Sequence, residues 1–288
     1  MQAVFVTILW ASSWVLIKIG LTDIPPLLFA GLRYSLGAVV LLMIYWRSKN
    51  RIVPQQLAKK TWLWLAAYGI IYYTLGQGTQ FVSLKYLPAV TTNLILSNIP
   101  LAVAIMSIIL LKEALTILQW GGMALSMAGV LLYFLPVQIV PAQWPGILAA
   151  FIGVLANASA SILGRALNRK GDLSALWITL VSMGIGSPLM LAIGLSTTPF
   201  PTISLANWFI IGWLAVVNTA FAFTLWNHTL KILTATESSM INTLMIAEIP
   251  FFATLLLGEQ VTGKEFAGLV LVMAGIILVQ LSALKTRS

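Results

Sequence analysis

The sequence predicts an all-α integral membrane protein whose ten transmembrane helices form two inverted five-helix repeats. The prediction depends on composition, on the length of the apolar runs and on a similarity between the two halves. Of the 288 residues, 60% are hydrophobic and 8% are charged, whereas a soluble globular protein carries about 25% charged residues. A membrane helix needs roughly 20 apolar residues. The chain therefore has room for about ten membrane helices and little else.

Breaks at proline, glycine and clusters of charge separate the predicted spans. The spans cover residues 3–20, 26–46, 62–82, 89–111, 117–135, 144–167, 174–195, 205–229, 235–257 and 264–283. Their apolar runs are continuous, unlike the alternating pattern of a membrane β-barrel. The first nine residues hold no Lys or Arg, so a secretory signal is not indicated and we expect this segment to remain as the first span.

The first two spans each carry a cation. In span 3–20, Trp10, Trp14 and Lys18 recur every four residues and share one helix face. We interpret this face as the wall of a cavity, with Lys18 near its outer mouth. An interfacial tryptophan and a snorkelling lysine are the alternative. In span 26–46, Arg33 is expected to form a structural ion pair, with substrate contact as the alternative.

The third span, 62–82, places Tyr73, Gly76, Gln77 and Gln80 on one stripe, with Tyr72 beside it. Two amides facing lipid would be costly, so this face is predicted to look inward. A hydrogen bond to a neighbouring helix is the alternative role for these amides.

The fourth span, 89–111, aligns Asn93, Ser97 and Pro100. Because Pro100 cannot donate to the carbonyl of Leu96, that free acceptor is predicted to be a ligand contact or a hinge. The fifth and tenth spans carry small residues, from Gly121 to Gly129 and from Gly268 to Gly275, which favour close helix packing.

The sixth span aligns Asn157 with small residues, and the seventh is placed by its apolar run alone. The eighth span aligns Asn218 and Trp226, and is followed by the only histidine, His228. A structural hydrogen bond and a proton-carrying role are the two interpretations of His228. In the ninth span, Glu248 is the only carboxylate predicted well inside the membrane, where it would serve proton coupling or pair with a polar group of another helix.

The two halves match when the sequence is shifted by 146 positions. Leu84-Lys85 then coincides with Leu230-Lys231, Glu113 with Glu259, and Met127-Ala128-Gly129 with Met273-Ala274-Gly275. We predict a first repeat over residues 1–138 and a second over residues 139–288. Because each repeat has an odd number of helices, the second enters the membrane from the opposite side, as in secondary transporters whose site lies between the halves. Glu113 and Glu259 are expected to anchor helix ends.

The basic residues predict the orientation. With a cytoplasmic N-terminus, the inside connectors and tail hold twelve of the sixteen Lys and Arg residues, in keeping with the positive-inside rule. The sequence therefore predicts a multi-pass protein of the inner (plasma) membrane, with both termini cytoplasmic. The net charge of +9 is distributed over these connectors, so no nucleic-acid partner is expected.

No arrangement of residues indicates catalysis. The chain has no cysteine, and it lacks the paired acids, or the serine with a histidine at membrane depth, that an intramembrane enzyme would need. We predict no enzymatic activity, no metal and no cofactor. The expected partners are a small-molecule substrate and the lipid bilayer, and the oligomeric state stays open.

The segment from Val90 to Leu131 resembles a known signature, with its Pro100, Lys112-Glu113, Thr116 and Gly121-Gly122. It is similar to helices 4 and 5 of the drug/metabolite transporter (DMT) superfamily, EamA type, and the segment from Ala235 to Ile277 resembles the same signature again. One departure is Ile246, which stands at the equivalent of Pro100. The resemblance implies a ten-helix exporter of amino acids or other small metabolites, with aromatic amino-acid exporters of the YddG type the most similar.

The sequence thus predicts a secondary transporter that exports amino acids with aromatic or bulky apolar side chains by alternating access. The alternatives are proton-coupled multidrug efflux of hydrophobic cations and a non-transporting membrane scaffold. The substrate-binding candidates are Trp10, Trp14, Tyr73, Gln77, Gln80, Asn93, Asn157, Asn218 and Trp226. The coupling or gating candidates are Lys18, Pro100, His228 and Glu248.

Overall fold

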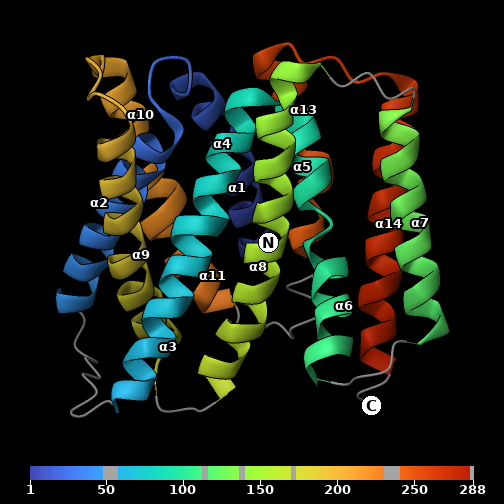
Figure 1. Ribbon diagram of the computed structural model, residues 1–288, viewed down its shortest axis with the longest axis horizontal. Helices are drawn as coiled ribbons and strands as arrows, with labels where there is room; N and C mark the ends of the chain where they lie inside the picture. The colour runs from blue at the N-terminus through green and yellow to red at the C-terminus, as the bar shows by residue number, and fades with distance from the viewer. Residues whose placement is uncertain (48–57, 112–115, 136–139, 170–172, 230–240, 286–288) are drawn as a thin grey trace.

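A computed structural model describes residues 1–47, 58–111, 116–135, 140–169, 173–229 and 241–285. Within these residues every regular element is helical. Eight helical segments are long and apolar enough to cross a membrane, and Ile241–Leu257 is a shorter apolar one. A tenth helical segment, which we call a rod because it joins three helices end to end, continues without a break from Lys59 to Tyr86. The predicted ten-helix membrane fold is confirmed (Figure 1).

The helices follow the predicted spans closely. The first half contains α1 (Gln2–Gly20), α2 (Pro26–Arg47), α3 (Lys59–Gly69), the π-helix η1 (Ile70–Gln77), α4 (Gly78–Tyr86), α5 (Ala89–Leu96), α6 (Ile99–Leu111) and α7 (Ile117–Phe134). The second half contains the short η2 (Pro141–Gln143), α8 (Trp144–Arg169), α9 (Ala175–Thr197), α10 (Leu205–Ala215), the π-helix η3 (Val216–Phe221), α11 (Ala222–Thr229), α13 (Met245–Leu257) and α14 (Gly263–Lys285). The start of the predicted span 235–257 and the predicted boundary between residues 138 and 139 lie outside the described residues.

Local signals define several helix ends. Thr116, Ser174 and Ser204 are N-caps whose hydroxyls accept hydrogen bonds from backbone N–H groups of the first turn, which satisfies donors that the helix itself leaves free. Gly258 ends α13 in the left-handed region, with φ of 69°. Only glycine adopts that conformation without a steric penalty.

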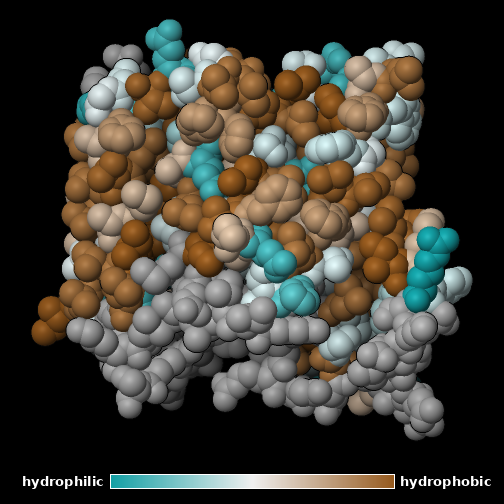
Figure 2. Space-filling model, turned by 180° about the vertical axis from the view of Figure 1, so that it is seen from behind, coloured by the Kyte–Doolittle hydropathy of each residue, from teal (hydrophilic) through white to brown (hydrophobic). Residues whose placement is uncertain are grey.

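Large apolar side chains cover the outside of the bundle. Leu63, Phe209 and Phe266 are each more than half exposed, and the face drawn in Figure 2 is mostly brown where it is described. A soluble protein rarely exposes so continuous an apolar surface. The surface is therefore one that contacts lipid.

The helix pair α7 and α14 shows how the halves are related. A Cβ atom added to Gly122 would lie 2.7 Å from the carbonyl oxygen of Gly275, and one added to Gly268 would lie 2.8 Å from that of Gly129. When 146 is added to the residue number in the first half and subtracted from the one in the second half, each of these two contacts becomes the other. A two-fold axis between the halves requires this exchange. The predicted close packing of the small residues is thus a contact between the fifth and tenth membrane helices.

The contacts of the other helices show the same two-fold relation. α1 packs against α11 and α13 of the second half, and its equivalent α8 packs against α4 and α6 of the first half. The two π-helices begin at Ile70 and Val216, which are 146 positions apart. The fold is therefore a pair of inverted five-helix repeats.

Both repeats interrupt their fourth helix at the same place. In the first half α5 ends at Leu96 and α6 begins at Ile99, and Leu101 N–H donates to Asn98 O at 3.0 Å. In the second half Ala247 N–H donates in the same way to Leu244 O at 2.9 Å. Because Ile246 stands where the first half has Pro100, the break does not depend on proline alone.

Candidate functional site

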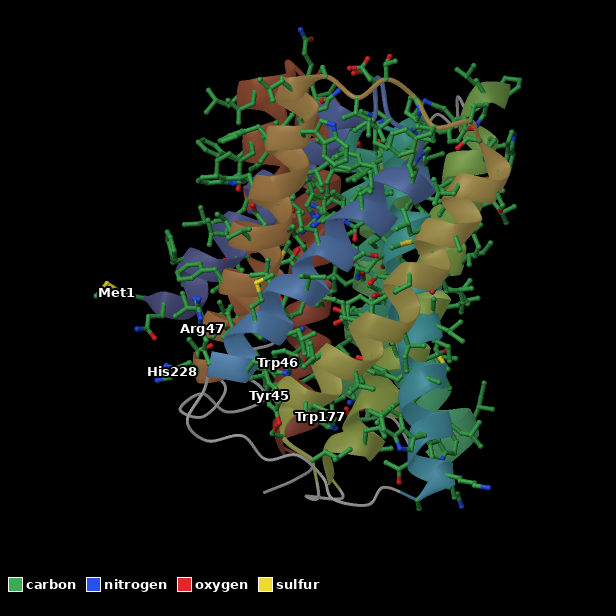
Figure 3. The ribbon with its side chains drawn as sticks, turned by 90° about the vertical axis from the view of Figure 1, so that its left-hand side faces the viewer. Met1, Tyr45, Trp46, Arg47, Trp177 and His228 are labelled. Carbon is green, nitrogen blue, oxygen red and sulfur yellow. The ribbon has the colours of Figure 1, made fainter. Side chains whose placement is uncertain are left out.

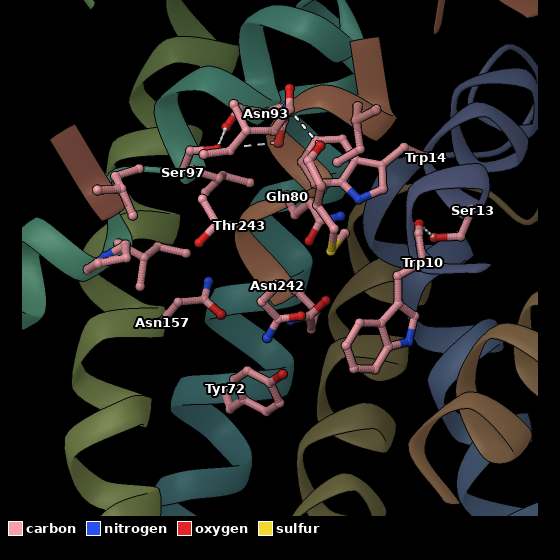
Figure 4. Close-up of a pocket in the computed structure, with 18 of the residues that line it drawn as sticks. Trp10, Ser13, Trp14, Tyr72, Gln80, Asn93, Ser97, Asn157, Asn242 and Thr243 are labelled. Atoms are coloured by element: carbon pink, nitrogen blue, oxygen red, sulfur yellow. Dashed lines mark hydrogen bonds between the residues drawn. The ribbon is translucent and has the colours of Figure 1, made fainter. Parts of the chain in front are cut away.

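A cavity of about 380 Å³ lies between the two halves, at the small end of the range of about 300–1,000 Å³ typical of ligand pockets. Six of the predicted substrate-binding residues line it together with Pro100 (Figure 4), namely Trp10, Trp14, Gln77, Gln80, Asn93 and Asn157. They come from four different helical rods. The structure thus brings together side chains that are up to 147 positions apart in the sequence.

The cavity is built from equivalent positions of the two repeats. Pairs separated by 146 positions line it from opposite sides: Gln77 and Phe223, Leu96 and Asn242, Ser97 and Thr243, Ile99 and Met245, Pro100 and Ile246. The cavity therefore lies on the axis that relates the halves. Several of these residues, Asn242 and Thr243 among them, had no polar stripe to mark them in the sequence, but the repeat itself points to their positions.

Trp10 forms an aromatic wall that is supported from behind. Its ring centroid lies 5.2 Å from that of Trp226 and 5.4 Å from that of Phe223. Its indole Nε1 donates to the backbone carbonyl of Asn218 at 3.2 Å, and the Asn218 amide donates in turn to Leu9 O. Trp226 and Asn218 do not line the cavity, and instead hold Trp10 in place.

Tyr72 lines the cavity together with Gln77, whereas the predicted Tyr73 does not. Both tyrosines belong to the π-helix η1, in which hydrogen bonds join residues five apart and not four, as in the α-helix. Tyr73 is 1% exposed and packs edge-on to Tyr34. Tyr34, which the sequence did not single out, donates its hydroxyl to Gln77 Oε1 at 2.6 Å.

Asn93 connects the two interrupted helices. Its amide nitrogen lies 3.3 Å from the carbonyl oxygen of Ile246, and Ser97 Oγ donates to Asn93 O at 2.7 Å. On the opposite side of the cavity, Asn157 donates to Gly153 O at 2.8 Å. Both amides therefore face the cavity while bonded to backbone carbonyls.

Arg33 lines the cavity without an ion pair. Its side chain is 4% exposed, and its Nε donates to Thr219 Oγ1 at 3.2 Å. Its guanidinium carbon lies 4.9 Å from the ring centroid of Tyr34 and 6.0 Å from that of Phe81. In the described part of the chain no acidic side chain contacts Arg33 or lines this cavity. The expected structural ion pair is thus not found there.

The remaining coupling candidates lie away from the cavity. Lys18 Nζ donates to Leu84 O at 2.7 Å and to Leu87 O, so it binds the end of α4. His228 is exposed in the last turn of α11 and points outward in Figure 3.

Glu248 lies behind the cavity, where α13 meets α1. Thr7 Oγ1 lies 3.0 Å from Glu248 Oε1 and 2.8 Å from Val4 O. The second carboxyl oxygen, Oε2, is buried and has no hydrogen-bond partner. Glu248 also borders an apolar groove of about 690 Å³ between α13 and α14, and it is the only charged residue that the structure places around this groove.

Hydrogen bonds join the two halves at the end of the bundle where α4 ends and α5 begins, the top of Figure 1, which we call the capped end. The carboxylate of Glu259 accepts from Ala89 N–H at 2.7 Å and from Val90 N–H at 3.1 Å. Its charge is favourable at this helix N-terminus. Asn207 Nδ2 also donates to Asp23 Oδ2 at 2.8 Å. Glu259 thus anchors a helix end as predicted, whereas Glu113 lies outside the described residues.

Comparison with known proteins identifies relatives over the whole length. Residues 1–135 and 144–281 each match the model of the EamA-like transporter family. The uncharacterized transporter YoaV of Bacillus subtilis is 27% identical over 95% of this chain and 93% of its own. A probable amino-acid metabolite efflux pump of Salmonella typhimurium is 28% identical over 96% of this chain and 92% of its own.

Two further comparisons concern location and fold. The uncharacterized inner membrane transporter YedA of Escherichia coli is 24% identical over 95% of this chain and 88% of its own. A solved crystal structure superposes with a TM-score of 0.68 at 20% identity, covering 99% of this chain and 98% of that one.

Proposed function

The chain belongs to the EamA-like transporter family, and on this premise we propose that it exports amino acids with aromatic or bulky apolar side chains. The observation that carries the proposal is the cavity between the halves, in which indoles and amides lie together. Trp10 and Trp14 would contact the apolar part of the substrate. Gln77, Gln80, Asn93 and Asn157 would bind its polar groups.

Alternating access is the proposed mechanism. Inverted halves offer two nearly equivalent arrangements, each open to one side of the membrane. The bonds from Glu259 and Asn207 hold the halves together at the capped end. Release of these contacts, with closure at the opposite end, would expose the cavity to the other side.

Uptake of labelled phenylalanine into liposomes that contain the purified protein tests this function. We expect uptake above that of empty liposomes, with competition by unlabelled aromatic and bulky apolar amino acids. Movement of small or polar amino acids, with no flux of phenylalanine or of bulky apolar amino acids, would contradict the proposed side-chain class. No flux of any amino acid would contradict amino-acid export and favour a different solute or the scaffold alternative.

The charge of the cavity argues against the efflux of hydrophobic cations. Arg33 supplies a positive charge, and no described lining residue is acidic. A cation in this cavity would be repelled and would find no carboxylate partner. An anionic or zwitterionic solute fits this lining better.

Proton coupling through Glu248 is a second candidate, and one observation favours it. Thr7 has a single hydroxyl hydrogen, yet its oxygen lies within hydrogen-bond distance of two acceptors, Val4 O and Glu248 Oε1. Both contacts are satisfied when Glu248 is protonated and donates to Thr7, which donates to Val4. An ionised carboxylate would leave Oε2 charged, buried and unpaired, which is costly.

In this candidate, loss of the proton would separate α13 from α1, which carries Trp10 and Trp14. We therefore expect Glu248→Gln to fold but to lose the dependence of transport on a pH gradient. Uptake into proteoliposomes with and without an imposed gradient is the measurement. Glu265→Gln is the matched control, because it removes a carboxylate that accepts from Thr262 N–H at the start of α14. Full gradient dependence in Glu248→Gln would rule this role out.

A further inference from the structure

We propose that Arg33 is the anion subsite of the cavity and that it binds the carboxylate of a zwitterionic substrate. The inference rests on the proposed function and extends it, because it names the group of the substrate that the protein recognises by charge.

Arg33 is a cation buried at a cost. The Arg33 side chain is 4% exposed within the membrane-spanning helix α2. A buried charge is costly unless a counter-charge or several hydrogen bonds compensate it. Among the described residues its one hydrogen-bond partner is Thr219, a neutral hydroxyl at 3.2 Å, and that hydroxyl is itself within 2.9 Å of Leu214 O. The charge therefore lacks a fixed anion in the described structure.

The remaining donors of Arg33 face the cavity. A guanidinium carries five N–H donors, and within the described part of the chain only Nε has a hydrogen-bond partner. The two terminal nitrogens are not among the buried atoms that lack a partner, and Arg33 lines the cavity. They are thus open to a molecule that enters it. Their planar fork matches the two oxygens of a carboxylate.

Neighbouring side chains hold the Arg33 guanidinium in place. Rings of Tyr34 and Phe81 lie 4.9 Å and 6.0 Å from the guanidinium carbon, at distances where a cation is attracted to a ring face. Thr219 belongs to η3 of the second half, whereas Arg33 belongs to the first half. A carboxylate bound here would therefore sit where the two halves already touch.

Titration calorimetry with the purified full-length protein tests the subsite with three ligands. Phenylalanine has both charged groups, 3-phenylpropionate keeps the carboxylate alone, and phenylalaninamide lacks it. We expect wild type to bind the two carboxylates about 10- to 100-fold more tightly than the amide, the range set by charge-assisted hydrogen bonds. Arg33→Gln should lose this preference, because it binds phenylalanine more weakly and no longer repels the ammonium group of phenylalaninamide, and Arg33→Lys should keep part of it.

Lys264→Gln is the matched control, because it removes one positive charge at an exposed site of α14. It should bind all three ligands as wild type does. Equal affinity of wild type for phenylalanine and its amide, or unchanged phenylalanine affinity in Arg33→Gln, would overturn the subsite. If Arg33→Gln does not elute as a folded protein in gel filtration, the preference of wild type and its reduction in Arg33→Lys decide the question.

Failure of the side-chain assignment can be told apart from failure of the subsite. If wild type binds none of the phenyl compounds, the same comparison is made with leucine and leucinamide. Tighter binding of leucine, lost in Arg33→Gln, would support the carboxylate subsite although the aromatic preference is wrong. Equal binding of leucine and leucinamide, or binding of neither pair, would overturn the subsite.

Discussion

At the scale of single residues, the cavity separates side chains that contact a ligand from side chains that support them. Trp14 lines the cavity, whereas Trp226 contacts Trp10 from behind. Helical periodicity could predict that these indoles lie inward, because the face of a helix follows from spacing. It could not predict that Trp226 lies behind Trp10 and away from the cavity, because that depends on how α1 and α11 pack.

Trp14→Ala should weaken binding of an aromatic substrate. An aromatic contact contributes about 0.5–1.5 kcal/mol beyond the area it buries, so we expect KM for phenylalanine uptake to rise about 3- to 10-fold. Uptake of a small substrate such as alanine should change less. Trp208→Ala on α10 is the control, because that side chain is 43% exposed on the outside of the bundle. An equal effect of both substitutions would contradict a direct contact.

Arg33 shows the limit of sequence reasoning at this scale. A cation within an apolar span marks a functional position, but the span does not say whether an acid faces it. Only the packing of α2 against η3 shows that its neighbour is a hydroxyl.

At the scale of elements, the membrane makes the helices predictable and leaves their local geometry open. Backbone groups in a bilayer must be satisfied within the protein, which favours continuous helices, so apolar runs and the prolines, glycines and charges that separate them located the spans. The π-helices could not be found in this way, because their hydrogen bonds leave no mark on hydropathy. The π-helix η1 carries both Tyr72 and Tyr73, and of these two side chains the structure places Tyr72 in the cavity lining.

Gly275→Ala should destabilise the pair α7 and α14. The added Cβ would lie 2.5 Å from both Gly122 O and Ser126 N, which are backbone atoms that cannot turn aside. Overpacking of this kind costs about 1–3 kcal/mol, and it should lower the melting temperature of the purified protein. Gly121→Ala, whose added Cβ would meet nothing within 4 Å, should melt with wild type. Identical melting of the two variants would contradict the close packing.

At the scale of the whole molecule, the charges have two separate roles. Most lie in connectors and predict the orientation, while Glu259 joins the halves at the capped end. The two-fold relation between the halves was predictable, because repeated residues and an odd helix count require it. The conformation of the molecule, in which hydrogen bonds join the halves at the capped end, could not be predicted from the sequence. One sequence would have to form both conformations of an alternating-access cycle.

Glu259→Gln should loosen the capped end. Hydrogen bonds to a charged group contribute about 1.5–3 kcal/mol, so opening at this end should become about tenfold more frequent. Because the chain has no cysteine, Ser97→Cys provides a single reporter in the cavity. Its labelling by an impermeant maleimide from the capped side should accelerate in Glu259→Gln. Glu265→Gln removes a carboxylate that caps Thr262 within one half, and faster labelling in this control would contradict the role of Glu259.

Labelling in intact cells tests the orientation. A single cysteine at Thr22, which is exposed at the capped end, should react with an impermeant maleimide added outside. One at Lys60, at the start of α3, should react only after permeabilisation. The reverse pattern would place both ends of the bundle on the opposite sides and overturn the assignment from the positive-inside rule.

The paired π-helices indicate an order of events in the history of this protein. Two independent changes at Ile70 and Val216 would be needed if each half had acquired its π-helix after the halves were joined. One change is enough if a five-helix ancestor already had it. The shared position therefore indicates that the π-helix was already part of the five-helix unit when that unit was duplicated.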